Sequence, residues 1–358
     1  MMAGAPHEAR WTQPEPRRSL PAPLLERLVR VAFPHSQVVE ALPLIDGLRN
    51  ANFKIRLDSS AETAVLRIYE HDSSLCQKEM DLIRLVSRAV PVPEVIHADV
   101  NGLADTPPFA LLRYVEGVSF REIKRHGDAA SVGQAAYAAG ETLASIHRFR
   151  FQMSGWLAPG PSVTAPLLEG LDTVPRFIDS CLASTNLQQR TQAELRDQIH
   201  AFVWSMASEL RGVENEPYLV HGDFGNRNLL LRNTAERWEV AAVLDWEFAV
   251  SSCPLADLGH FLRYERCSRP LVEPDFSRGY QDAGGSLRKD WRQLARVIDL
   301  TALCESLTHD QLPDTVVSEL VELVRATVEG HDPQLPWHRK DVTRAQHENV
   351  ILWRGLNG

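Results

Sequence analysis

Tyr218-Leu-Val-His-Gly-Asp-Phe-Gly-Asn-Arg-Asn228 is the most informative stretch of this 358-residue chain. It places a histidine, an aspartate and an asparagine close together, at His221, Asp223 and Asn228. A carboxylate there can orient an attacking hydroxyl group. An amide oxygen one short loop away can bind Mg²⁺, which prefers hard oxygen ligands. Taken alone, the same residues also fit an ordinary turn, because Asp, Asn and Gly are common in turns.

A second motif, Ala241-Ala-Val-Leu-Asp245-Trp-Glu247, ends an apolar strand on a carboxylate. The runs Leu229–Leu231 and Val240–Leu244 predict a hairpin between the two motifs. The first motif has the H-x-D-x-x-x-x-N spacing of phosphoryl-transfer loops, and a second aspartate after a strand is the other metal ligand of that class. An Asp that merely caps a turn is the alternative for the second motif alone, and the joint order of both motifs argues against it. We therefore predict Asp223 as the catalytic residue and Asn228 and Asp245 as Mg²⁺ ligands.

Composition limits the class of protein. The chain is 44% hydrophobic and 24% charged, as expected of a globular protein, and its length fits two domains or one bilobal domain. Its net charge of −9 argues against a general nucleic-acid binder. Five scattered cysteines without a C-x-x-C pair argue against a disulfide framework or zinc site and favour a reducing cytoplasm. No run approaches the roughly 18 apolar residues of a membrane span, so no membrane partner is expected.

The pattern of expected elements changes near residue 116. Before it, periodicity and turn residues predict helices and strands at Pro23–Phe33, Val38–Pro43, Asn52–Leu57, Thr63–Tyr69, Ser73–Val90, Glu94–Ala98 and Phe109–Val115. After it, helices are predicted at Ala129–Phe149, Ala193–Leu210, Arg288–Leu307 and Pro313–Val328. We divide the chain into a loose extension (1–22), a small nucleotide-binding lobe (23–116) and a larger catalytic and acceptor-binding lobe (117–358). The closing segment 334–358 suggests no function.

These motifs resemble those of the aminoglycoside phosphotransferase/choline kinase family, over roughly residues 40 to 330. His221–Asn228 matches the catalytic loop, Val243-Leu-Asp245-Trp the metal-binding segment, and Cys253-Pro-Leu-Ala-Asp257-Leu a stretch that braces the loop. The resemblance implies an α+β, bilobal protein-kinase-like fold. Its small N-terminal lobe would hold an antiparallel sheet and one main helix, and its larger C-terminal lobe would be mostly helical. It also implies that His221 and Asp257 support the loop structurally.

The resemblance assigns the ATP phosphates to two features of the small lobe. Gly47-Leu-Arg-Asn-Ala-Asn52 would cover them through Gly47, Asn50 and Asn52, although a segment without G-x-G-x-x-G also fits a polar hairpin turn. Arg67, in Val65-Leu-Arg67-Ile, stands where the family usually carries a lysine. Since a guanidinium does not simply replace an ammonium, this departure leaves the phosphate contacts open.

Two further assignments follow from the resemblance. Glu79 would pair with the cation at residue 67, with an exposed surface charge as the alternative. The C=O of Arg113 and the N–H of Val115, in the segment Leu111–Gly117, would bind adenine between the lobes.

The resulting prediction is an ATP- and Mg²⁺-dependent phosphotransferase that acts on a hydroxyl of a small molecule, either an antibiotic such as an aminoglycoside or a metabolite. A protein kinase is one alternative, against which the lack of an A-P-E-type segment after Asp245-Trp-Glu counts. A nucleotide-binding regulator with weak catalysis is another, motivated by Arg67 and the glycine-poor loop. The sequence does not identify the acceptor, the preference for ATP over GTP, or the oligomeric state.

Overall fold

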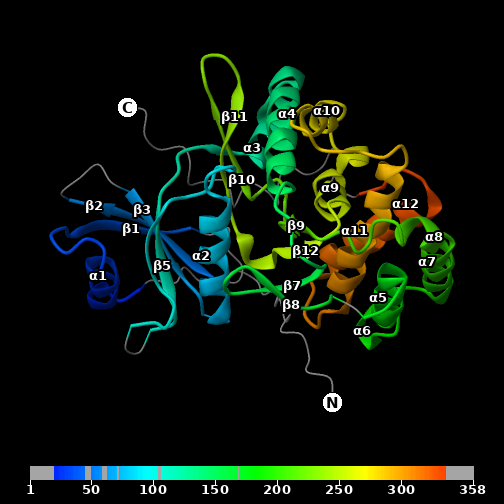
Figure 1. Cartoon of the computed structure of the whole chain (residues 1–358), viewed down its shortest axis with the longest axis horizontal. Helices are drawn as coiled ribbons and strands as arrows, with labels where there is room; N and C mark the ends of the chain where they lie inside the picture. Colours follow the sequence, from blue (N-terminus) through cyan, green and yellow to red (C-terminus); the bar gives the residue numbers. More distant parts are fainter. Residues whose placement is uncertain are drawn as a thin grey trace.

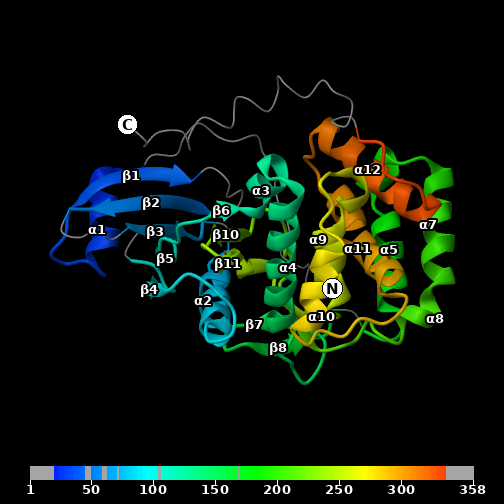
Figure 2. The same ribbon diagram turned by 90° about the horizontal axis from the view of Figure 1, so that it is seen from above.

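The computed structural model describes residues 20–44, 50–58, 63–70, 72–103, 106–167 and 169–335. Gly47 and most of the predicted extension and closing segment lie outside these ranges. Figures 1 and 2 show a sheet-based part formed by the first third of the chain and a larger, mostly helical part beside it. This is the predicted α+β architecture.

The N-terminal sheet is antiparallel, with strand order β1-β2-β3-β5-β4. Its strands are β1 (Val38–Leu44), β2 (Ala51–Leu57), β3 (Thr63–Ile68), β4 (Val95–Asp99) and β5 (Phe109–Arg113). Helices α1 (Ala22–Arg30) and α2 (Ser74–Val86) cover its opposite faces (Figure 1).

Alternation along β3 directs one side chain toward the rest of the molecule. Leu66 and Ile68 pack in the cluster under α1, whereas Val65 packs in the cluster that contains α2. Because successive strand residues point to opposite faces, Arg67 lies on the α2 side. The strand therefore presents a cation to the helix that carries Glu79.

The helical part contains α3 (Phe120–His126), α4 (Ala129–Ile146), α5 (Thr173–Leu182), α6 (Thr185–Arg190), α7 (Ala193–Ser205), α8 (Ala207–Leu210), α9 (Leu255–Leu262), α10 (Asp275–Asp282), α11 (Trp291–Thr308) and α12 (Asp314–Glu329). The helix predicted over Ala193–Leu210 is two helices, because Met206, with φ −98° and ψ 1°, departs from helical geometry and bonds back to Val203. No helix in the described ranges is long and apolar enough to cross a membrane.

Two small sheets lie within the helical part. One has the order β11-β10-β6, from β6 (Val118–Ser119), β10 (Leu229–Asn233) and β11 (Trp238–Val243). The other has the order β8-β7-β12-β9, from β7 (Gly155–Ala158), β8 (Ser162–Ala165), β9 (Tyr218–Val220) and β12 (Val250–Ser252). The pairing of β10 with β11 confirms the predicted hairpin.

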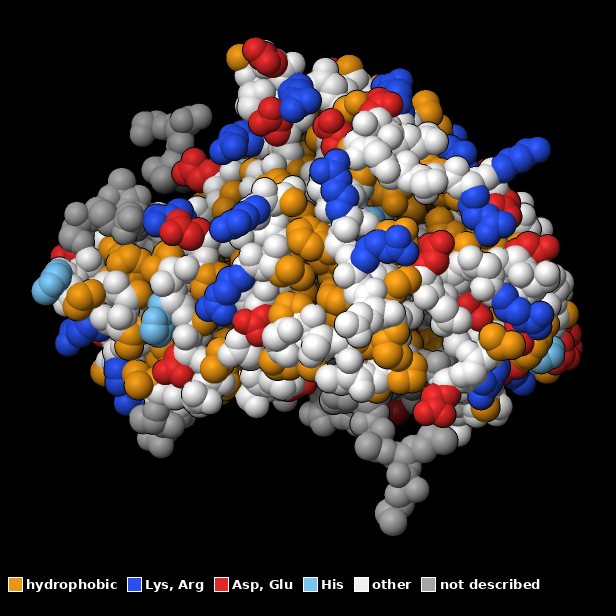
Figure 3. All heavy atoms as spheres, viewed as in Figure 1, with side chains coloured by type: hydrophobic (Ala, Val, Ile, Leu, Met, Phe, Trp, Pro, Cys, Tyr) orange, Lys and Arg blue, Asp and Glu red, His pale blue; other side chains and the backbone are white. Residues whose placement is uncertain are grey.

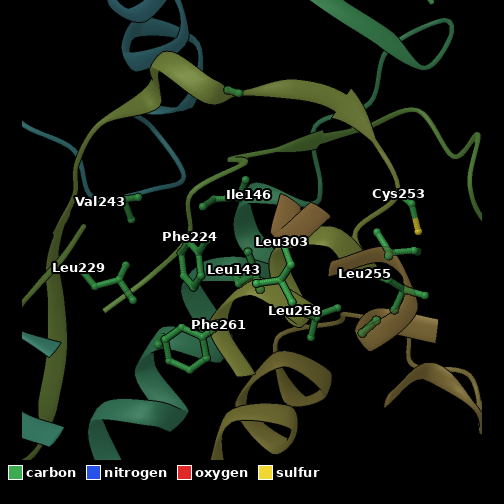
Figure 4. Packing of buried hydrophobic residues seen from close by; sticks show 14 of the residues in the cluster. Leu143, Ile146, Phe224, Leu229, Val243, Cys253, Leu255, Leu258, Phe261 and Leu303 are labelled. Atoms are coloured by element: carbon green, nitrogen blue, oxygen red, sulfur yellow. The ribbon is translucent and has the colours of Figure 1, made fainter. Parts of the chain in front are cut away.

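A continuous apolar core anchors the segment that follows β9. Phe224 is fully buried, and its ring centroid lies 5.8 Å from that of Phe261 on α9. Figure 4 shows both rings among Leu143, Leu229 and Leu258. The residue directly after Asp223 therefore connects the loop to α9.

All five cysteines are buried and free.

Candidate active site

Asp223 lies in the loop between β9 and β10, and both of its carboxylate oxygens have partners. Asn228 Nδ2 donates to Oδ2 at 2.8 Å, and His260 Nε2 lies 3.1 Å from Oδ1. Burial acts to raise the pKa of Asp223, but the interactions with His260, above all the hydrogen bond, outweigh it and hold the pKa below its usual value. The group is thus an oriented carboxylate at neutral pH. His260 was missed by the sequence analysis because it lies on a different element, 37 residues after Asp223.

Asp257 on α9 braces the start of this loop. Its Oδ2 accepts from the backbone N–H of His221 at 2.8 Å, and its Oδ1 accepts from that of Gly222 at 2.9 Å. Gly222 has φ +79°, and a Cβ there would lie 2.4 Å from the carbonyl oxygen of Phe248. The turn therefore requires glycine at this position.

Two buried histidines complete the support of the loop. His221 Nδ1 accepts from the N–H of Asp223 at 3.2 Å, and its Nε2 lies 3.0 Å from the carbonyl oxygen of Leu244. His147 at the end of α4 contacts Asp257 through Nε2 at 3.2 Å and the hydroxyl of Tyr280 through Nδ1 at 2.9 Å. In each ring both nitrogens are engaged, so packing and hydrogen bonds fix the orientation of the ring.

The β10–β11 hairpin brings the two sequence motifs together. The N–H of Leu244 donates to the carbonyl oxygen of Asn228 at 2.8 Å, so Asp245 follows directly after a residue bonded to Asn228. Asp245 has the left-handed conformation φ 68°, ψ 66°, which is uncommon for a non-glycine residue and often marks a functional constraint. Because the side-chain nitrogen of Asn228 donates to Asp223, the side-chain oxygen Oδ1 is the atom that Asn228 can offer to a cation. An amide and a carboxylate oxygen fit Mg²⁺, which takes few protein ligands and completes its shell with phosphates and water.

Arg67 joins the sheet to this motif through three carboxylates. Its Nε lies 3.0 Å from Glu79 Oε2, and its Nη2 lies 2.5 Å from Asp245 Oδ1 and 3.6 Å from Glu247 Oε2. The contact with Glu79 is an ion pair without hydrogen-bond geometry at Nε. Glu79 is 2% exposed and also accepts from the hydroxyl of Tyr69, so it is not an exposed surface charge. Burial alone lowers the pKa of Arg67, but the acids around it raise it well above its ordinary value.

Glu247 is a further buried acid that sequence reasoning did not assign. Its Oε2 accepts from Asn50 Nδ2 at 2.8 Å, and its backbone oxygen accepts from Lys78 Nζ at 2.9 Å. Burial lowers the pKa of Lys78 from its ordinary value to about 8. Both residues are sequence neighbours of predicted site residues, since Lys78 precedes Glu79 and Glu247 ends the Asp-Trp-Glu motif. This adjacency in the sequence is the signal that could have indicated both residues as members of the site.

The other nucleotide-binding candidates lie at different distances from this cluster. Asn52 is paired in register with Arg67 across β2 and β3, and its side chain donates to the backbone of Asn50 at 3.5 Å. Arg113 ends β5, and its side chain pairs with Glu94 at 2.6 Å. Val115 lies just beyond, in the connection to the helical part. The structure thus brings Asn50, Asn52, Arg67, Glu79 and Asp245 together and leaves Arg113 and Val115 at the junction.

A small antiparallel sheet covered by α1 and α2, joined to a helical part whose hairpin connects the two motifs, is the architecture of a protein-kinase-like phosphotransferase. The chain belongs to the phosphotransferase enzyme family, whose family model matches residues 40–296. The resemblance predicted from the sequence is thereby confirmed.

Solved structures share the fold. Aminoglycoside phosphotransferase APH(4)-Ia, in a ternary complex with ADP and hygromycin B, superposes with a TM-score of 0.61 at 17% identity, covering 85% of this chain and 98% of that one. A GDP complex of aminoglycoside 2'-phosphotransferase-IIIa gives 0.61 at 17%, covering 86% and 99%. A protein from Thermobifida fusca that is provisionally named fructosamine-3-kinase gives a TM-score of 0.57 at 16% identity, covering 85% of this chain and 98% of that one. These similarities confirm the protein-kinase-like fold.

The curated sequence relatives are longer proteins, and the similarity covers only a part of each. Acyl-CoA dehydrogenase family member 11 of Gallus gallus is 28% identical over 184 residues, which are 50% of this chain and 22% of that protein. The protein of the same name from Rattus norvegicus is 27% identical over 270 residues, covering 73% and 32%. The chain therefore spans about a fifth to a third of the length of these relatives.

Proposed function

We propose that the protein transfers the γ-phosphoryl group of ATP to a hydroxyl group of a small molecule. The proposal rests on the geometry at Asp223, whose two carboxylate oxygens lie 2.8 Å from Asn228 Nδ2 and 3.1 Å from His260 Nε2. The lowered pKa of this carboxyl group is consistent with its role as a base. Each carboxylate oxygen has two lone pairs, so one at each oxygen remains for an acceptor hydroxyl. A cytoplasmic location, where ATP is supplied and the buried thiols stay reduced, belongs to the same proposal.

In this mechanism Asp223 orients the acceptor hydroxyl toward the phosphorus and takes its proton. Asn228 and Asp245 would hold Mg²⁺, which when bound neutralises charge on the phosphates. Asn50, Asn52, Arg67 and Gly47, which lies outside the described residues, would position the phosphates, with Glu79 orienting Arg67. The main chain of Arg113 and Val115 would bind the adenine. Asp257 and His221 would maintain the geometry of the loop. In this mechanism, catalysis is chiefly positioning of the reactants and electrostatic stabilisation of the transition state.

Arg67 is the residue that separates this proposal from a weakly catalytic regulator. It lies beside Asp245 and is held by Glu79, so a guanidinium occupies the place at which a phosphate-binding cation is expected. A guanidinium binds phosphate oxygens through paired N–H groups, which supports a working nucleotide site. Binding of Mg·ATP without turnover of any acceptor would favour the regulator instead.

The decisive experiment is a Mg·ATP consumption screen against hydroxyl-bearing metabolites and aminoglycosides, followed by product analysis by mass spectrometry. With the best acceptor, Asp223→Asn is expected to lower kcat about 100-fold or more, as for loss of a general base. Asp58→Asn changes an exposed aspartate in the same way and serves as the matched control. Activity of Asp223→Asn within a few-fold of wild type would refute the assignment. Phosphorylation of protein substrates alone would favour a protein kinase.

A further inference from the structure

His260 connects Asp223 to a buried ion pair that the proposed mechanism has not used. Its Nε2 lies 3.1 Å from Asp223 Oδ1, and its Nδ1 lies 3.1 Å from Arg263 Nη2. Arg263 in turn donates to Asp299, from Nε to Oδ2 at 2.9 Å and from Nη2 to Oδ1 at 2.7 Å. The four side chains form one continuous chain of polar contacts.

The chemistry of the two ends fixes the position of the imidazole hydrogen. A guanidinium carries only donors, so Nδ1 of His260 must accept from Arg263. An ionised carboxylate only accepts, so Nε2 must carry the hydrogen that faces Asp223. Asp223 requires a hydrogen on Nε2, and the contact with Arg263 requires a bare Nδ1, so the neutral Nε2–H tautomer is the form that satisfies both neighbours. A second proton at Nδ1 would face the guanidinium and abolish that hydrogen bond.

Close packing of two helices makes this arrangement rigid. Gly259 on α9 approaches α11 so closely that a Cβ would lie 2.3 Å from the carbonyl oxygen of Ala295. Arg263 follows Gly259 by one helical turn, and Asp299 follows Ala295 by one turn, so the contact between the helices brings the ion pair together. Their side chains are 14% and 7% exposed. Phe224, which directly follows Asp223, packs against Phe261 on α9 and so fastens the loop to that helix (Figure 4).

We propose that His260 is a positioning residue for Asp223, and that Arg263 with Asp299 holds it as the neutral Nε2–H tautomer. This inference rests on the proposed function, in which Asp223 takes the hydroxyl proton. A neutral donor fixes the orientation of the carboxylate and weakens it as a base less than an imidazolium would, because an imidazolium would add a full ion pair to the hydrogen bond. His260 is not itself the base, since its one lone pair, at Nδ1, faces Arg263.

Nitrogen-15 NMR of histidine-labelled protein tests the tautomer directly and needs no turnover. His260→Gln identifies the signals of this ring. We expect wild-type His260 to show a pyrrole-type Nε2 and a pyridine-type Nδ1. A wild-type ring protonated at Nδ1, or doubly protonated at neutral pH, would overturn the proposal.

The variant Arg263→Met/Asp299→Leu removes the ion pair without leaving an unpaired buried charge. We expect the Nε2–H tautomer to lose its dominance and kcat to fall about tenfold, with KM for Mg·ATP within about twofold, because only orientation of the base is lost. Arg266→Met is the matched control: it removes a neighbouring ion pair, to Asp332, and should change neither the NMR signals nor kcat. If circular dichroism shows the double variant unfolded, Arg263→Lys gives the same test. Its ammonium stays paired with Asp299 but lacks the planar fork.

An unchanged kcat in a folded variant would refute the positioning role while leaving the proposed function intact. Absence of wild-type turnover with every acceptor would refute the proposed function and with it this role. The tautomer measured by NMR distinguishes these two failures.

Discussion

Asp257 Oδ2 accepts a hydrogen bond from the backbone N–H of His221 at 2.8 Å, across 36 residues of sequence. A fully buried carboxylate on α9 thus fixes the loop that carries Asp223. The same helix supplies His260, so one element both braces the loop and contacts its catalytic candidate. On the face shown in Figure 3, acidic and basic side chains are interspersed, whereas Arg67, Glu79 and Asp257 are buried inside the molecule.

Replacing Asp257 with Asn is expected to destabilise the fold. The amide has one acceptor oxygen, so one of the N–H groups of His221 and Gly222 loses its partner, at a cost of about 1–3 kcal/mol in the free energy of unfolding. Urea denaturation measures the change. Asp282→Asn alters an exposed aspartate and should stay within about 0.5 kcal/mol of wild type. Equal effects of the two variants would contradict the bracing role.

Stability should also fall on acidification in a way that depends on Asp257. Burial acts to raise the pKa of Asp257, but the hydrogen bonds and charge of His147, with His221, hold it below its ordinary value. A carboxyl group with a lowered folded-state pKa contributes stability that is present above its unfolded pKa, near 4, and is lost as pH falls through the folded pKa. The stability difference between wild type and Asp257→Asn should therefore be constant above about pH 5 and shrink below about pH 4. A difference that stays constant down to pH 2.5 would disprove this.

Gly222→Ala tests the turn that the two N–H donors require. The left-handed φ of +79° costs an alanine about 1 kcal/mol, and the new Cβ would clash with the carbonyl oxygen of Phe248 at 2.4 Å. We expect a loss of about 2 kcal/mol or more and a lower kcat. Gly284→Ala is the matched control, since its φ is +95° but no atom lies within 4 Å of the added Cβ. Similar thermal midpoints for the two variants would show that the clash is relieved.

The local motifs of the site could be predicted from the sequence because each lies on one continuous segment. The spacing of His221, Asp223 and Asn228 and the strand before Asp245 are local patterns, and the β10–β11 hairpin between them follows from turn chemistry. Arg67 and Glu79 could be assigned through a resemblance, and their contact agrees with it. The roles of all these residues remain predictions.

The contacts that cross the fold could not be predicted in the same way. His260 meets Asp223, and Asn50 meets Glu247 across 197 residues, only because separate elements pack together. Short strands such as β6 and β12 were also missed, since two or three residues carry no measurable periodicity. These contacts form only when the elements pack in the tertiary structure, and the local sequence around each residue contains no pattern that indicates its partner.

Arg67→Lys tests whether the guanidinium is needed at its place beside three acids. An ammonium is a single point charge and cannot contact Glu79 and Asp245 through separate nitrogens. We expect lower stability, by about 1–3 kcal/mol, and weaker Mg·ATP binding, because a buried carboxylate loses its partner. Calorimetric titration with Mg·ATP measures the second effect. Arg56→Lys, which alters an exposed pair with Glu40, is the control. If Arg67→Lys binds Mg·ATP more tightly than wild type, the family's usual lysine is the better ligand in this site.

Lys78 gives a prediction with the opposite pH dependence. Burial lowers its pKa to about 8, so between about pH 8 and 10.5 the unfolded chain holds a proton that the folded protein has released. The contribution of Lys78 to the free energy of unfolding therefore increases with pH across that window. At pH 7 the buried ammonium opposes folding. Lys78→Met should gain stability relative to wild type at pH 7, and this advantage should shrink toward pH 10, as measured by urea unfolding at each pH. Lys289→Met removes an exposed lysine and should show a pH-independent difference. An advantage of Lys78→Met that is absent at pH 7, or that grows toward pH 10, would mean that the hydrogen bond to the Glu247 carbonyl outweighs the burial of the charge.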